Sequence, residues 1–126
     1  MTSTDKKVGY FPESKPKLSD PAHTPLSAAA GVEGAFRMLE GRWKMLILFH
    51  LFDCKVLRFS GLEKAIPGIT QKMLIQQLRQ LEADGIVLRT QYPEIPPRVE
   101  YSLTDWGQSL CPALDTILAW AERRPA

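Results

Sequence analysis

The sequence is short of the residues that metal sites and disulfide scaffolds require. Its 126 residues contain only two cysteines, Cys54 and Cys111, with no CxxC pair, and two histidines, His23 and His50. A small disulfide scaffold needs more cysteine, and these four side chains lack the spacing of metal ligands. We therefore expect reduced, partly buried thiols and no metal, with a redox-sensing thiol as the alternative.

Long apolar runs and catalytic motifs are also missing. The longest apolar run, MLILFHLF at 45–52, contains a histidine and is far too short to span a bilayer. The N-terminus has no apolar segment typical of a signal peptide. No GxSxG, GxxxxGK[ST], GxGxxG or HExxH motif occurs. These absences predict a cytoplasmic protein that is not an enzyme and has no cofactor or membrane partner.

The N-terminal part differs in composition from the rest. Residues 1–30 hold four of the ten prolines and few large apolar residues, so this segment buries too little to offset its ordering entropy. It is predicted to be a flexible arm, or a segment that docks on a partner subunit. Residues 31–126 then form one domain, since the chain is 44% apolar. The net charge of +2 neither requires nor excludes a polyanionic partner.

Apolar spacing predicts a series of helices followed by a hairpin. The first two cover VEGAFRMLE and RWKMLILFHLFD, and KVLRF is a short extended piece. SGLEKAI follows, with Ser60 and Glu63 at capping-box spacing. A helix over about 70–84 has Thr70 as N-cap, and Gly85 ends it. The prolines of QYPEIPPRVEY lie between two strand-like runs, so 86–103 is predicted to be a hairpin.

This order of elements predicts a mainly α fold with a small β-hairpin wing, the winged helix-turn-helix. A final helix is expected to begin after the N-cap Thr104 and to kink or restart near Pro112. No repeat or low-complexity tract interrupts the series. The order is more specific than any single motif within it.

The helix over 70–84 carries the chemistry of a DNA-reading helix. Its leucines share one face, and the other carries Gln71, Lys72, Gln76 and Arg79. Glutamine can pair with adenine, and lysine or arginine with guanine, in the major groove. Arg58 and Ser60, beside the preceding helix, are expected near the DNA backbone. Arg89 and Arg98 flank the proline tip and can contact phosphates or the minor groove, with Glu100 as a cross-strand partner of one of them. A merely solvated polar face is the alternative.

Three stretches resemble the HxlR-type transcriptional regulators, relatives of the MarR winged-helix proteins. They are GRWKMLILFHL, LRFSGLEKAIPGITQKMLIQQLRQLEADGIVLRT and YPEIPPRVEYSLTDWGQSL, and the resemblance covers about Val32 to Glu122. It implies a homodimeric DNA-binding regulator of prokaryotic origin that binds a pseudo-palindromic operator in double-stranded DNA. It also implies dimerisation through the N- and C-terminal helices. The interface residues would be Phe36, Leu39, Leu114, Ile117 and Trp120.

One departure from the family pattern concerns a thiol. Many members carry a sensing cysteine just before the first helix, where this chain has AGVE, with Ala30 at about that position. This puts a thiol switch in doubt and leaves Cys111 as a weak redox candidate. Two other functions stay open: a winged-helix protein-interaction module, and gating by a small apolar or aromatic effector near Trp43, Phe49 and Trp106.

Overall fold

The computed structural model describes residues 22–126 and divides at Leu39 into two units. The described part of the first unit is a single helix, α2 (Pro25–Leu39), whose last residue belongs to the second unit. The helix begins within the segment for which the sequence predicts an arm, because apolar and small residues continue the helical pattern upstream of Val32. The rest of the predicted arm, residues 1–21, lies outside the described residues.

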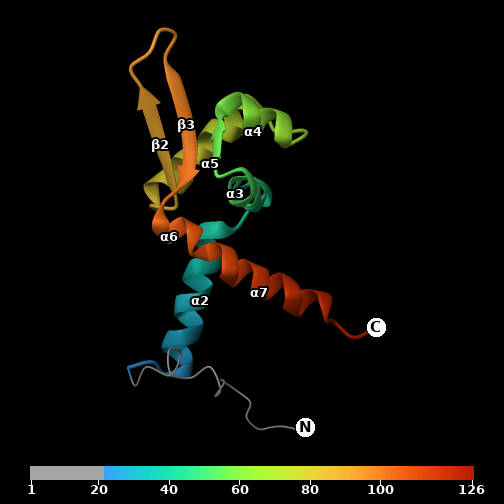
Figure 1. Cartoon of the computed structure of the whole chain (residues 1–126). Helices are drawn as coiled ribbons and strands as arrows, with labels where there is room; N and C mark the ends of the chain where they lie inside the picture. Colours follow the sequence, from blue (N-terminus) through green and yellow to red (C-terminus); the bar gives the residue numbers. More distant parts are fainter. Residues whose placement is uncertain (1–21) are drawn as a thin grey trace. The chain divides into compact units, whose positions relative to one another are not determined.

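The second unit places helices around one apolar core (Figure 1). Helix α3 (Arg42–Cys54) supplies three fully buried side chains, Ile47, Leu48 and Leu51. Helix α4 (Phe59–Ala65) and helix α5 (Gln71–Ala83) pack against it. Between α4 and α5 the chain turns at Gly68, whose φ of 87° favours glycine. This pair of helices joined by a tight turn is the predicted helix-turn-helix.

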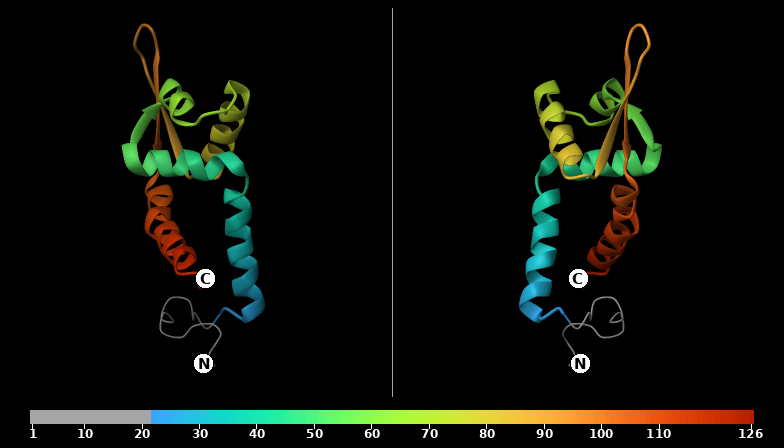
Figure 2. Two further views of the ribbon diagram at one scale, coloured as in Figure 1. Left: turned by 90° about the vertical axis from the view of Figure 1, so that its right-hand side faces the viewer. Right: turned by 90° about the vertical axis from the view of Figure 1, so that its left-hand side faces the viewer.

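A three-stranded antiparallel sheet completes this unit. The strands are β1 (Val56–Arg58), β2 (Val87–Tyr92) and β3 (Arg98–Leu103), in the order β1-β3-β2. We call β2, the loop 93–97 and β3 the wing, and it extends beyond α4 and α5 in both views of Figure 2. The Ile95–Pro96 peptide bond in the loop is cis. The predicted hairpin is confirmed, and the short extended piece is found as a third strand.

The end of the wing leads into two further helices, α6 (Asp105–Gln108) and α7 (Leu110–Glu122). Thr104 caps α6 by accepting a hydrogen bond from the Gly107 amide at 2.9 Å, as predicted. The helix restarts at Ser109, so Pro112 falls in the first turn of α7, where its missing N–H costs little. No helix within residues 22–126 has the length and apolar character to cross a bilayer.

The winged helix-turn-helix fold is therefore confirmed, but one predicted cap is wrong. Helix α4 starts at Phe59, and its N-cap residue is Arg58, which makes no side-chain capping bond. Ser60 lies inside the first turn, so it cannot form a capping box with Glu63. The strand β1 runs directly into the helix, so the N-cap lies at Arg58, two residues earlier than the predicted cap at Ser60.

Candidate nucleic-acid interface

One face of α5 carries polar side chains that are free of partners. Leu74, Leu78 and Leu81 are buried on the opposite face. The outer face exposes Gln71, Lys72, Gln76 and Arg79. Within residues 22–126, no ion pair or side-chain hydrogen bond engages any of these four. Their amide and cationic donors therefore remain available for base edges or phosphates.

The N-terminal end of α5 is also suited to a negatively charged ligand. The Thr70 hydroxyl accepts a hydrogen bond from the Met73 amide at 3.1 Å, which confirms the predicted N-cap. The first turn contains no acidic residue, so the positive end of the helix dipole is not neutralised locally. Gly85, with a φ of 77°, follows the helix as predicted. Unpaired polar side chains and an end that favours an anion thus occur on one helix of 13 residues.

A groove of about 600 Å³ lies between α5 and the wing. Ile75, Arg79 and Glu82 line it from α5, and Arg89, Val99 and Tyr101 line it from the sheet. The two arginines are suited to phosphate oxygens, and the apolar wall is suited to sugar carbons. The carboxylate of Glu82 would repel a phosphate that lies beside it in the groove. Ile75 is 38% exposed, in keeping with its position toward the outer side of the helix.

The two residues that the sequence places near the DNA backbone, Arg58 and Ser60, lie on different elements. Ser60 is exposed in the first turn of α4. Arg58 is the last residue of β1 and lies opposite Glu100 of β3. Directly opposed residues share one face of a sheet. Since Tyr101, next to Glu100, faces the groove, Arg58 belongs to the other face of the sheet.

The two wing arginines also lie on opposite faces. Arg89 is opposite Tyr101, while Arg98 is opposite Tyr92. Because successive side chains alternate between faces, Arg89 shares the groove face with Tyr101, and Arg98 lies on the outer face. Arg89 donates a hydrogen bond to the Gln91 side chain at 3.3 Å. Among the described residues, no carboxylate forms an ion pair with Arg89.

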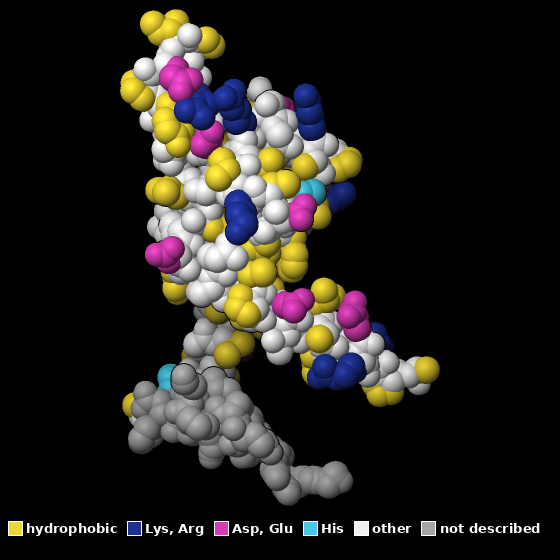
Figure 3. Space-filling view, viewed as in Figure 1, with side chains coloured by type: hydrophobic (Ala, Val, Ile, Leu, Met, Phe, Trp, Pro, Cys, Tyr) yellow, Lys and Arg dark blue, Asp and Glu magenta, His cyan; other side chains and the backbone are white. Residues whose placement is uncertain are grey.

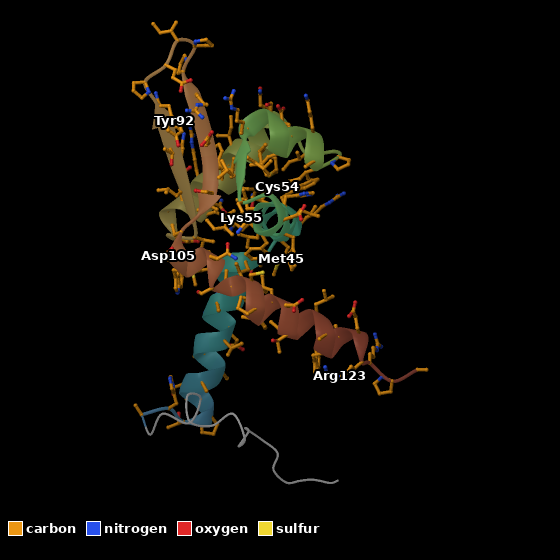
Figure 4. All side chains as sticks on the ribbon, in the orientation of Figure 1. Met45, Cys54, Lys55, Tyr92, Asp105 and Arg123 are labelled. Atoms are coloured by element: carbon orange, nitrogen blue, oxygen red, sulfur yellow. The ribbon has the colours of Figure 1, made fainter. Side chains whose placement is uncertain are left out.

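Arg98 is held by three neighbours within the wing. Its Nη2 lies 2.8 Å from Glu94 Oε2, and its Nη1 lies 2.9 Å from Glu100 Oε2. Its guanidinium stacks over the Tyr92 ring at 3.9 Å from the centroid, near the outer end of the wing (Figure 4). The hydrogen bonds that Arg98 donates to the Glu94 carboxylate raise the pKa of Arg98 above its usual range. Glu100 thus pairs with an arginine of its own strand and not across the hairpin.

The predicted dimer-interface residues fall into two groups. Phe36 on α2, and Ile117 and Trp120 on α7, are exposed to 54%, 44% and 70%. Leu39 and Leu114 are instead buried in the core of their own chain, at 5% and 6% exposure. This corrects their expected place on the surface, because both point inward at the helix ends that join the core. Leu118, next to Ile117 on α7, is likewise exposed, at 46%.

Neither cysteine is in a disulfide. Cys54, at the end of α3 (Figure 4), is exposed, and Cys111 is half-buried. In the described part of the chain, no three His, Cys, Asp or Glu side chains gather as a metal would require. The groove beside α5 is lined by none of Trp43, Phe49 and Trp106, the residues considered for an effector.

Comparison with known proteins gives one family. The profile of the HxlR-like helix-turn-helix family matches residues 38–125. An uncharacterized HTH-type transcriptional regulator of Methanothermobacter thermautotrophicus is 50% identical over 91 residues, which are 72% of this chain and 69% of that protein. The regulator YtcD of Bacillus subtilis, also uncharacterized, is 49% identical over 71% of this chain and 70% of its own.

A solved structure agrees with this result. A regulator of the MarR family from Enterococcus faecalis V583 superposes with a TM-score of 0.76 at 35% identity, covering 82% of this chain and 91% of that one. All of these proteins are described as transcriptional regulators.

Proposed function

Because the chain belongs to the HxlR-like helix-turn-helix family of DNA-binding transcriptional regulators, we propose that it binds a specific operator as a homodimer, with α5 in the major groove. The observation that carries this proposal is the outer face of α5, where Gln71, Lys72, Gln76 and Arg79 are exposed and unpaired. A DNA-reading helix needs free donors of this kind. A solvated helix more often mixes acidic and basic side chains.

The wing extends the proposed contact beyond the helix. Arg79 and Arg89 line the groove between α5 and the sheet, and this groove is suited to one sugar-phosphate chain. Thr70 and Ser60 lie at or near the starts of α5 and α4, where hydroxyl and amide donors can reach phosphates. Arg58 approaches DNA only if the backbone also passes the outer face of the sheet.

A homodimer is proposed from the exposed apolar side chains of two helices. Ile117, Leu118 and Trp120 are exposed on α7, and Val32 and Phe36 are exposed on α2. Contiguous apolar surface of this kind marks protein interfaces, and a second copy of the chain is the natural occupant in a helix-turn-helix protein. A two-fold dimer implies an operator with two half-sites about one helical turn, roughly 34 Å, apart.

The proposal is tested with DNA selected from a random pool. Fluorescence anisotropy with the selected duplex, repeated over a range of salt concentrations, gives the affinity and its salt dependence. Lys72→Ala and Arg79→Ala should each weaken binding by about 1–3 kcal/mol, with a salt slope smaller by about 0.9 for each protomer if the lost contact is to a phosphate.

Arg123→Gln, at the far end of α7 (Figure 4), is the matched control and should bind as the wild type does. Sedimentation of the same samples reports the dimer. Failure of the wild type to enrich any sequence, or variants at Lys72 and Arg79 that bind normally, would contradict the proposal.

A further inference from the structure

The apex of the wing is apolar and fully exposed. Ile95 is 100% exposed, and Pro93, Pro96 and Pro97 around it are exposed as well. Figure 3 shows hydrophobic side chains gathered at this tip, with charged side chains below them. A side chain with no contacts in its own chain contributes no burial energy to folding. The fold itself therefore does not explain an isoleucine at this position.

The apex also has no free cation. The nearest cation along the chain is Arg98, and it is paired with two carboxylates, Glu94 at 2.8 Å and Glu100 at 2.9 Å, so the three side chains together carry a net charge of −1. Tyr92 covers one side of its guanidinium. Arg98 further lies on the outer face of the wing, away from the groove beside α5. The sequence-based expectation that Arg98 contacts a phosphate or the minor groove thus has little geometric support.

The apex lies further out along the wing than the groove beside α5. Val99 lines the groove, and Ile95 lies four residues further out along the chain. Residues 95–97 belong to the loop and β3 begins at Arg98, so at about 3.3 Å per residue the apex lies at most roughly 13 Å beyond Val99. A sugar-phosphate chain seated against Arg79 and Arg89 would therefore bring the apex to the next opening of the duplex. With α5 in the major groove, that opening is the minor groove.

We propose that Ile95 enters the minor groove as an apolar contact and that Arg98 is a positioning residue that fixes the tip. This inference rests on the proposed DNA-binding function. Apolar side chains of minor-groove proteins pack against sugars and base edges. A guanine places an amino group on the floor of that groove, whereas an A·T pair does not. Ile95 therefore selects A·T over G·C pairs where the tip meets the operator, without any hydrogen bond.

The first test measures the affinity of the full-length protein for three versions of the selected duplex. The base pairs facing the wing are A·T, G·C or inosine·cytosine, which has the major-groove edge of G·C without the minor-groove amino group. Wild-type protein should bind the A·T and inosine duplexes about equally and the G·C duplex more weakly. Ile95→Ala should reduce affinity for the A·T duplex by about tenfold, remove most of the preference and leave the salt slope unchanged.

Leu88→Ala is the matched control, since Leu88 is an exposed apolar residue on the outer face of the same hairpin. It should keep both the affinity and the preference. Ile95→Ala that binds all three duplexes as the wild type does would overturn the inference. So would a wild-type preference that follows the major-groove edge, with the inosine duplex bound as weakly as the G·C duplex.

The second test separates a positioning role of Arg98 from a DNA contact. The double variant Glu94→Gln/Arg98→Gln keeps the net charge of the wing while removing the ion pair. We expect an unchanged salt slope and a reduced A·T preference, because the tip is held less firmly. A slope smaller by about 0.9 for each protomer would show that Arg98 contacts phosphate, and the assignment would be wrong.

The tests distinguish this inference from the function on which it rests. Normal sensitivity to Lys72→Ala, combined with no effect of Ile95→Ala, leaves DNA binding intact and overturns the role of Ile95. A wild-type protein that binds none of the duplexes overturns both.

Discussion

The two ends of the wing are fixed by different forces. At the base, the Thr104 amide donates to the Ile86 carbonyl at 3.0 Å, and the Thr104 hydroxyl donates to the Gly85 carbonyl at 2.6 Å. Ile86 and Val87 are buried there, at 1% and 3% exposure. At the tip, an ion pair joins Arg98 and Glu94, whose side chains are 28% and 49% exposed, and the neighbouring prolines are exposed. Exposed ion pairs add little stability and are screened by salt.

The difference separates folding from recognition along one hairpin. Changes at the base disturb buried packing and hydrogen bonds, so they should act on the stability of the whole unit. Changes at the tip alter local stiffness and surface chemistry, so they should act on binding at little cost in stability. The tip is thus the part of the wing whose chemistry can change while the fold stays the same.

The largest effect is expected at Gly107, where α6 meets the base. A β-carbon added to this buried glycine would collide with the Ile86 carbonyl oxygen, a backbone atom that cannot move aside. Gly107→Ala should therefore reduce the free energy of unfolding by about 3 kcal/mol. Urea denaturation measures this, with Gly31→Ala in α2 as control, because nothing lies within 4 Å of an added β-carbon there. If Gly107→Ala were as stable as the wild type, the base of the wing would not support the fold as described.

A smaller loss is expected at Thr104. Thr104→Val keeps the shape but removes the cap of α6 and leaves the Gly85 carbonyl without its hydroxyl donor. The cost should be about 2 kcal/mol in the free energy of unfolding. Thr90→Val is the control, since Thr90 lies at mid-strand in β2 and its hydroxyl has no hydrogen bond within the described chain. Equal losses in the two variants would mean that the hydrogen bonds of the Thr104 hydroxyl add no measurable stability.

The smallest effect on stability is expected at the tip. Replacing both Pro96 and Pro97 with alanine should cost less than about 1 kcal/mol, mainly through the entropy of the unfolded chain. It should also weaken operator binding a few-fold, because a looser tip loses more entropy when bound, with sequence preference at α5 unchanged. Denaturation and anisotropy on one preparation give both values. A large loss of stability would show that the tip, like the base, supports the fold.

Much of this contrast could be predicted from the sequence. The leucines of α5, the caps Thr70 and Thr104 and the prolines of the tip are local signals, and each element was found where its signal placed it. Local patterns suffice there because helix periodicity and capping depend on residues within a few positions. The free polar face of α5 follows from the same periodicity.

The sequence-based predictions that failed depended on contacts between residues far apart in the sequence. The pairing of β1 with β3 joins residues such as Val56 and Ser102, and it also moves the start of α4 and prevents the expected cap at Ser60. Whether Arg89 or Arg98 faces the groove depends on the hairpin register, which composition does not reveal. The inward direction of Leu39 and Leu114 likewise required the packed core.

The register of the wing has a consequence for its length. Side chains alternate in direction along each strand, so adding one residue to β3 between Val99 and Thr104 would exchange the two faces of the outer part of the strand. Arg98 would then turn toward the groove and Val99 away from it. Adding two residues, matched by two in β2, would preserve every orientation and move Ile95 outward by roughly 7 Å. A redesigned wing can therefore be lengthened in steps of two residues per strand, which makes its reach along DNA adjustable in discrete increments.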